Sequence, residues 1–133
     1  MIFLDTSFLA ALFNSRDADH LRAKELMKKI EKGEYGSFAT SDYVFDELMT
    51  FLQARTKNHD LAVQSGIFLR SSETTTYYVL PTIFDETWKL FQKRSGLSFT
   101  DCSTIELMKA NTIKNVASFD QDFASFKEVN VIR

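Results

Sequence analysis

Residues 2–13, with the sequence IFLDTSFLAALF, begin with a short apolar run that is followed at once by Asp5 and then by a second apolar stretch. The first run predicts a buried strand. An aspartate directly after a strand is either the N-cap of a helix or a functional carboxylate, and Thr6 or Ser7 would cap the same helix equally well. A functional role for Asp5 requires further acids elsewhere in the chain that converge on it.

The rest of the chain continues this alternation of short strands and helices. Strands are predicted for MIFL, GSFAT, TTTYYVLP, NVASF and VNVIR, and helices for HLRAKELMKKIEKG, residues 41–54, residues 58–70, TIFDETWKLFQKR and TDCSTIELMKAN. Two of these helices carry apolar faces that we expect to point inward, namely Leu21, Leu26 and Ile30 in the first and Ile83, Trp88 and Phe91 in the fourth. Strands that alternate with helices predict an α/β fold with a mainly parallel sheet.

Length and composition restrict the possible classes of protein. With 133 residues, 44% of them hydrophobic, the chain has the size and the apolar content of one domain, which we expect to span residues 1–133. A single cysteine, Cys102, excludes an internal disulfide. We find no apolar segment that approaches the roughly 18 residues of a membrane-spanning helix and no basic segment typical of a secretory signal. We therefore expect a cytoplasmic protein without a membrane partner.

The net charge of −2 gives the chain no general attraction for nucleic acid, so any such contact has to be local. Small basic clusters are present at Lys28-Lys29, at Arg55 with Lys57, and at Lys93-Arg94. Taken singly, each cluster is interpreted as a solvated helix face.

A second candidate acid lies in SDYVFDELMTFLQ. At about 100° per residue, Glu47 falls between Tyr43 and Phe51 on the edge of the apolar face, whereas Asp46 points away from it. A carboxylate on the inner side of a helix is protonated, paired or metal-bound, because an isolated buried charge costs several kcal/mol. An interior salt bridge with a basic residue remains the structural alternative for Glu47.

The third candidate is in LSFTDCSTIELM. Thr100 is a possible helix cap, and Asp101 in the first turn gains from the helix dipole, which is a sufficient structural reason for an acid there. Asp101 also shares a helix side with Ile105 and Met108, so we expect it to face inward. The neighbouring Cys102 is interpreted as a small packed residue, since no histidine partner is evident. The two histidines, His20 and His59, lack metal-ligand spacing and are expected on helix surfaces.

The fourth candidate is in ASFDQDF, residues 117–123, where Asp120 and Asp122 follow the apolar end of a predicted strand. A capped turn and a metal site both explain acids at this place. In parallel sheets, reactive groups gather beyond the carboxyl ends of the strands. Asp5 and one of these two acids are therefore expected to meet.

With four acids in this order, the sequence resembles a PIN-domain ribonuclease and is most similar to the VapC toxins of toxin–antitoxin pairs. The blocks that carry the resemblance are IFLDTSFLAALF, DELMTFL, LSFTDCSTIELMKAN and ASFDQDF, and the likeness extends from residue 2 to about residue 126. It implies a three-layer α/β/α domain with a four- to five-stranded, mainly parallel sheet. It also implies cleavage of RNA phosphodiester bonds by a metal-dependent hydrolase.

The resemblance further implies roles for particular residues. Asp5, Glu47, Asp101 and Asp120 correspond to the family's acidic quartet around Mg²⁺ or Mn²⁺, Asp122 to an additional acid, and Thr6 or Ser7 to its small hydroxyl residue. Hard divalent cations prefer such oxygen ligands. One metal ion and two are both compatible with this set. Family members commonly form homodimers, which we expect here through residues 21–70, and are blocked by a cognate antitoxin.

Other functions fit the sequence less well. A phosphoaspartyl phosphatase usually carries a second Asp two residues after the first, where this chain has Ser7. A receiver-type regulatory domain needs a phosphorylatable Asp after a middle strand, and none is apparent. An RNA-processing nuclease without an antitoxin remains an alternative, as does a non-catalytic binding module, which would have no use for four converging acids.

Overall fold

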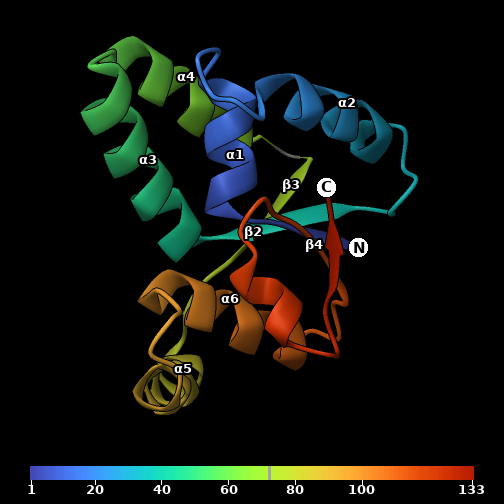
Figure 1. The fold of residues 1–133 in the computed structure, drawn as a ribbon, viewed down its shortest axis with the longest axis vertical. Coiled ribbons are helices and arrows are strands. Elements are labelled where there is room, and N and C mark those ends of the chain that lie inside the picture. Colours follow the sequence, from blue (N-terminus) through green and yellow to red (C-terminus); the bar gives the residue numbers. More distant parts are fainter. Residues whose placement is uncertain (72) are drawn as a thin grey trace.

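The computed structural model describes residues 1–71 and 73–133 and contains a five-stranded sheet with helices on both of its faces (Figure 1). In chain order the elements are β1 (Ile2–Leu4), α1 (Thr6–Phe13), α2 (His20–Glu31), β2 (Phe38–Ser41), α3 (Asp42–Thr56), α4 (His59–Leu69), β3 (Thr74–Tyr77), α5 (Pro81–Lys93), α6 (Phe99–Ala110), β4 (Asn115–Ala117), a 3₁₀ turn η1 (Asp122–Ser125) and β5 (Asn130–Ile132). The α/β prediction is confirmed.

The strand order is β3-β2-β1-β4-β5, and all four neighbouring pairs are parallel. The chain builds the sheet outward from β1 in one direction through β2 and β3, and then returns to place β4 on the other side of β1. Leu4 of β1 is in register with Ala117 of β4. The boundary between β1 and β4 is therefore the point at which the strand order reverses, where ligands bind in open α/β sheets.

The two layers of helices are separated by the sheet. Figure 1 shows α1, α2 and α4 on one side and α5 and α6 on the other, with α3 running beside α1. The two neighbouring strands β1 and β4 are apolar and buried at Ile2, Phe3, Leu4, Val116 and Ala117, as expected for strands covered on both faces, and only Asn115 at the start of β4 is polar. This arrangement confirms the three-layer α/β/α expectation.

Two predicted helix faces are wrong in part. Leu21 of α2 is 75% exposed, because the buried face of that helix is Ala23, Leu26, Met27 and Ile30. In α5, Trp88 and Phe91 are 49% and 38% exposed. The buried position of α5 is Thr87, whose small side chain is satisfied by a 2.7 Å hydrogen bond to the carbonyl of Ile83.

Among the described residues, no helix is both long enough and apolar enough to cross a membrane.

Candidate active site

Asp5 lies at the carboxyl end of β1, at the point where the strand order reverses, and is only 2% exposed. Its backbone N–H donates to the carbonyl of Ala117 at 3.1 Å, which extends the β1–β4 pairing by one residue. Its side chain caps α1 by accepting a hydrogen bond from the backbone N–H of Ser7 at 3.2 Å. The structural explanation for Asp5 is therefore confirmed, and the residue also lies where a site was predicted.

Two serines fix the Asp5 carboxylate. The hydroxyls of Ser7 and Ser118 both donate to Asp5 Oδ2, at 2.7 and 2.8 Å. Each hydroxyl also accepts a backbone N–H from the segment after β4, Ser7 Oγ from Phe119 and Ser118 Oγ from Asp120, both at 3.0 Å. The two serines thus join the loop after β4 to the carboxylate after β1.

Asp5 Oδ1 is different, because it is buried and accepts no hydrogen bond from the described residues. An unpartnered buried carboxylate oxygen costs free energy unless something binds it. The orientation that the serines impose on Oδ2 therefore leaves one carboxylate oxygen available to a ligand.

Glu47 is partly buried, in agreement with its predicted position at the edge of the apolar face, and extends from α3 toward Thr6 at the start of α1. Its Oε2 atom accepts a 2.5 Å hydrogen bond from the hydroxyl of Thr6. No salt bridge to Glu47 exists within residues 1–71 and 73–133, so the alternative of an interior ion pair is wrong. Asp46 is exposed, as expected.

Asp101 is 8% exposed in the first turn of α6. Its Oδ2 atom accepts from both the backbone N–H and the hydroxyl of Ser98, at 3.0 and 2.7 Å, while Ser98 Oγ accepts from the backbone N–H of Asp101. This reciprocal arrangement is a capping box. The predicted cap at Thr100 is wrong, because the helix begins one residue earlier and Ser98 is positioned to close the box.

The two acids of ASFDQDF are placed differently. Asp120 is half-buried after β4 and lines the same cavity as Asp5, whereas Asp122 is exposed at the start of η1 and does not line it. The backbone N–H of Asp122 donates to Asp120 Oδ1 at 2.9 Å, so this second residue orients the first through its main chain. The structure therefore brings Asp120 to the other acids and leaves the side chain of Asp122 outside.

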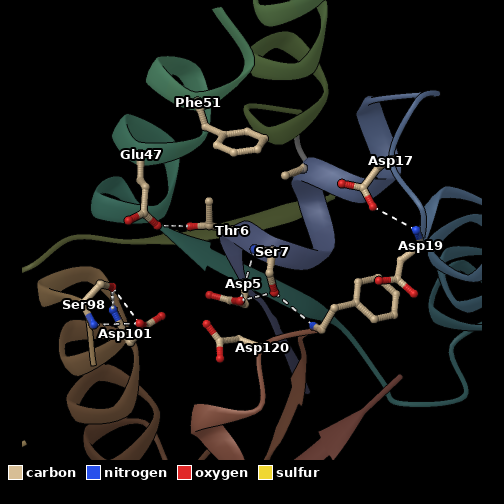
Figure 2. A pocket seen from close by; sticks show the side chains of 12 residues that line it. Asp5, Thr6, Ser7, Asp17, Asp19, Glu47, Phe51, Ser98, Asp101 and Asp120 are labelled. Carbon is tan, nitrogen blue, oxygen red and sulfur yellow. Dashed lines mark hydrogen bonds between the residues drawn. The ribbon is translucent and has the colours of Figure 1, made fainter. Parts of the chain in front are cut away.

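These side chains border one cavity of about 430 Å³. Figure 2 shows the carboxylates of Asp5, Asp101 and Asp120 directed toward a common space, with Glu47 beside Thr6 above them. The remaining residues that line this carboxylate cavity are Ser7, Ala10, Asp17, Asp19, Phe51, Ser98 and Phe119. The acids come from four separate parts of the chain.

The crowding of carboxylates changes their protonation. Burial, and to a lesser extent the charge of Asp101, raises the pKa of Asp5 from 3.8 to about 6, against the lowering effect of the Ser7 and Ser118 hydrogen bonds. Burial also raises the pKa of Asp101, with smaller contributions from the charges of Asp120 and Glu47. The cavity therefore carries an unfavourable excess of negative charge that a cation would neutralise.

The donor set fits a hard divalent cation, because it consists of carboxylate oxygens and includes the unpartnered Asp5 Oδ1. In the side-chain positions of the described residues, no three Asp, Glu, His or Cys side chains are close enough to hold an ion by themselves. A Mg²⁺ ion keeps several of its waters when it binds to protein. Water ligands would therefore complete the coordination between these carboxylates.

Several residues at the cavity were missed by the sequence analysis. Ser98 and Ser118 orient two of the acids, and Asp17 and Asp19 add two carboxylates from the loop before α2. The alternating pattern could not identify the serines, because their importance depends on contacts between residues far apart in the chain. Cys102 is buried and free, as expected. His20 is not a simple surface residue, since its Nδ1 lies 2.8 Å from the carbonyl of Ala11.

Comparisons with known proteins identify relatives over almost the whole chain. The family model of the PIN domain matches residues 2–129. The 23S rRNA-specific endonuclease VapC20 of Mycobacterium tuberculosis is 33% identical over 133 residues, covering 97% of this chain and 98% of that protein.

Solved structures with the same fold include the crystal structure of the Mycobacterium tuberculosis VapC20, a sarcin–ricin loop cleaving toxin. It has a TM-score of 0.86 and 31% sequence identity, with coverage of 97% of this chain and 98% of that chain. A toxin–antitoxin complex from Klebsiella pneumoniae has a TM-score of 0.72 and 17% identity, with coverage of 100% and 97%. These likenesses confirm the predicted fold.

Proposed function

Because the chain belongs to the PIN-domain family, we propose that it is a metal-dependent endoribonuclease that acts as the toxin of a toxin–antitoxin pair. The observation that carries the proposal is the convergence of Asp5, Glu47, Asp101 and Asp120 on one cavity, with the buried oxygen Asp5 Oδ1 lacking any partner among the described residues. Helix capping explains one oxygen each of Asp5 and Asp101, but it does not explain why four carboxylates gather around one cavity in spite of their mutual repulsion. Hydrolysis of a phosphodiester assisted by Mg²⁺ or Mn²⁺ accounts for them.

Each residue has a distinct role in this proposal. Asp5, Asp101 and Asp120 would hold the cation directly or through water, and the cation would lower the pKa of a bound water and offset charge on the phosphate. Glu47, whose carboxylate accepts a hydrogen bond from the hydroxyl of Thr6, would orient a water molecule and accept its proton.

The surrounding residues keep the carboxylates in place. Ser7 and Ser118 hold Asp5 Oδ2, and Ser98 holds Asp101 Oδ2. These hydrogen bonds fix the rotamers of two acids before a substrate arrives, so less reorganisation is required during the reaction. Asp122 contributes through its backbone rather than as a ligand.

We propose RNA as the substrate, an antitoxin as the protein partner and the cytoplasm as the place of action. The mycobacterial relative is named as an endonuclease of 23S rRNA, and its structure as a toxin that cleaves the sarcin–ricin loop, so an RNA hairpin of that loop is the first substrate to test. A homodimer is supported by exposed apolar side chains on α4, Val63 and Ile67, which lie inside the expected region 21–70. Light scattering at micromolar concentration tests the dimer.

The experiment for the main proposal measures cleavage of that hairpin by the purified chain. We expect cleavage with Mg²⁺ or Mn²⁺, none in excess chelator, and a loss of orders of magnitude in Asp101→Asn, which keeps the shape of the side chain but removes its charge. Asp46→Asn is the matched control, because it makes the same substitution at an exposed aspartate that does not line the cavity.

Two results would contradict the proposal. Undiminished cleavage in chelator would exclude the metal mechanism. Equal activity of Asp101→Asn and Asp46→Asn would exclude the carboxylate cavity as the active site.

A further inference from the structure

We propose that a second hollow, next to the carboxylate cavity, binds a backbone phosphate of the RNA strand that is cut there. This arginine hollow has a volume of about 430 Å³ and is lined by the polar residues Asn14, Ser15, Arg16, Arg55, Thr56 and Asn58, together with Leu61. The inference rests on the proposed ribonuclease function and adds to it the place where a neighbouring, uncleaved part of the substrate is held.

The hollow and the carboxylate cavity are consecutive along the same two helices. On α1, Ala10 lines the cavity, and Asn14, the C-cap residue four positions later, lines the hollow. On α3, Phe51 lines the cavity, and Arg55, one turn later, lines the hollow. Four helical residues span about 6 Å, so both helices lead from one site directly to the other.

The same stripe of α3 begins at the proposed reaction centre. Glu47 and Arg55 are separated by two turns, which is about 12 Å along the helix axis. The hydrogen bond between Thr6 and Glu47 joins α1 to α3 at the end where the two helices border the carboxylate cavity. The Arg55 guanidinium lies 5.8 Å from the centre of the Phe51 ring, between the two sites. The separation of about 12 Å between Glu47 and Arg55 suits a phosphate that belongs to the same strand as the cleaved bond but not to the bond itself.

The two arginines of the hollow have no carboxylate partner among the described residues, although this chain pairs other basic side chains. Arg22 is paired with Asp19, and three lysines are each paired with a glutamate three residues away. Arg16 and Arg55 are exposed and are in none of the salt bridges. A guanidinium presents parallel N–H donors that match phosphate oxygens, so two unpaired arginines in one hollow suit this ligand.

The backbone that carries the arginines is held by local hydrogen bonds. The backbone N–H of Arg16 donates to Asn14 Oδ1 at 3.2 Å. At the other wall, Thr56 Oγ1 donates to the carbonyl of Leu52 at 2.7 Å and accepts the backbone N–H of Asn58 at 3.2 Å. The main chain is therefore fixed on both sides, while the guanidinium groups stay free to bind.

Charge explains why an RNA-cleaving chain needs such a site. The net charge is −2, and the carboxylate cavity is bordered by six acidic side chains, which repel a phosphate backbone. Affinity for RNA must then come from local cations. The arginine hollow places two of them beside the cavity, without an acid in its lining.

The test compares Arg16→Gln/Arg55→Gln with wild type in cleavage of the hairpin RNA with Mn²⁺. Both arginines are exposed, so the melting temperature should not change. We expect kcat/KM to fall about tenfold at low salt while kcat at saturating RNA is retained, because the lost contact is made equally in the ground state and the transition state. The slope of log kcat/KM against log salt should become shallower by about 0.7, the value for one phosphate of a single strand.

The control outside the hollow is Arg70→Gln, the same type of substitution at the exposed C-terminal end of α4, which removes one positive charge where the double variant removes two. A second measurement uses RNAs with one uncharged methylphosphonate linkage at successive positions. At one of these positions, other than the cleaved bond itself, the methylphosphonate should reduce kcat/KM of the wild type. This reduction should vanish in the double variant.

The inference is overturned if the double variant keeps the wild-type kcat/KM and salt slope, or if Arg70→Gln loses as much. It is also overturned if the double variant cuts RNA normally but loses affinity for an acidic peptide, since the hollow would then serve a protein partner. Failure of the proposed function gives a different result, namely no cleavage by wild type with Mn²⁺. In that case, equal RNA binding by wild type and double variant in a filter assay would overturn the phosphate site as well.

Discussion

Substitution of Asp5 by asparagine should make the metal-free protein more stable at neutral pH. The folded-state pKa of Asp5 is raised from 3.8 to about 6, mainly by burial. The folded protein therefore binds more protons than the unfolded chain between these two values, and the stability falls as the pH rises through that window. At about 1.4 kcal/mol per pKa unit, the ionised Asp5 costs about 3 kcal/mol above pH 6. Asparagine carries no charge and retains an oxygen for the Ser7 and Ser118 hydroxyls.

The assay is urea unfolding of wild type and Asp5→Asn in chelator at several pH values between 4 and 7.5. We expect the difference in unfolding free energy to be small near pH 4 and to rise to about 3 kcal/mol in favour of the variant at pH 7.5. Other carboxylates titrate in both proteins, so they largely cancel in the difference. Added Mn²⁺ should stabilise wild type more than the variant, because the variant has lost a ligand charge. A variant that is less stable at pH 7.5 in chelator, or a difference that is flat with pH, would refute this reasoning.

Three further predictions concern individual contacts at the cavity. Asp120→Asn should lower turnover about 100-fold and weaken the thermal shift caused by Mn²⁺, whereas Asp122→Asn should change neither, because only Asp120 lines the cavity. Equal effects of the two substitutions in cleavage and melting assays would contradict this assignment. Thr6→Val should reduce kcat with a stability loss of about 1 kcal/mol or less, since it removes the hydrogen bond that orients Glu47. An unchanged kcat in steady-state cleavage would show that this hydrogen bond has no role in the reaction. Ser98→Ala should cost about 1 kcal/mol in urea unfolding through loss of the capping box, and an unchanged midpoint would contradict it.

Much of the fold was predictable because strands and helices alternate with strong apolar periodicity. The central strands were found from their apolar runs, and each predicted helix is present with its ends shifted by only a few residues. The errors occur where an apolar residue is not a buried one. Leu21 and Trp88 fit a helical period but lie on exposed sides, because the packing partner of each helix decides which of several apolar stripes is buried.

The acids of the site were predictable for a different reason. Asp5 and Asp120 follow strands that the topology places side by side, and a parallel sheet brings the carboxyl ends of its strands to one edge. Glu47 was identified by helical angles alone. Ser118 carries no comparable signal, because a serine after a strand is common and its value lies in one contact with Asp5, 113 residues away in sequence.

Helix capping and metal binding were treated as alternatives for Asp5 and Asp101, yet the geometry of the two caps is compatible with both. In both residues one oxygen, Oδ2, accepts the hydrogen bonds that cap or brace the start of a helix, which fixes the side-chain rotamer. Backbone N–H groups at a helix N-terminus also stabilise a negative charge and so offset part of the repulsion between neighbouring acids. The second oxygen of Asp5 is then left buried and unpartnered toward the cavity. A cap is therefore not evidence against a ligand, because the capping hydrogen bonds are what hold the carboxylate in a position to bind one.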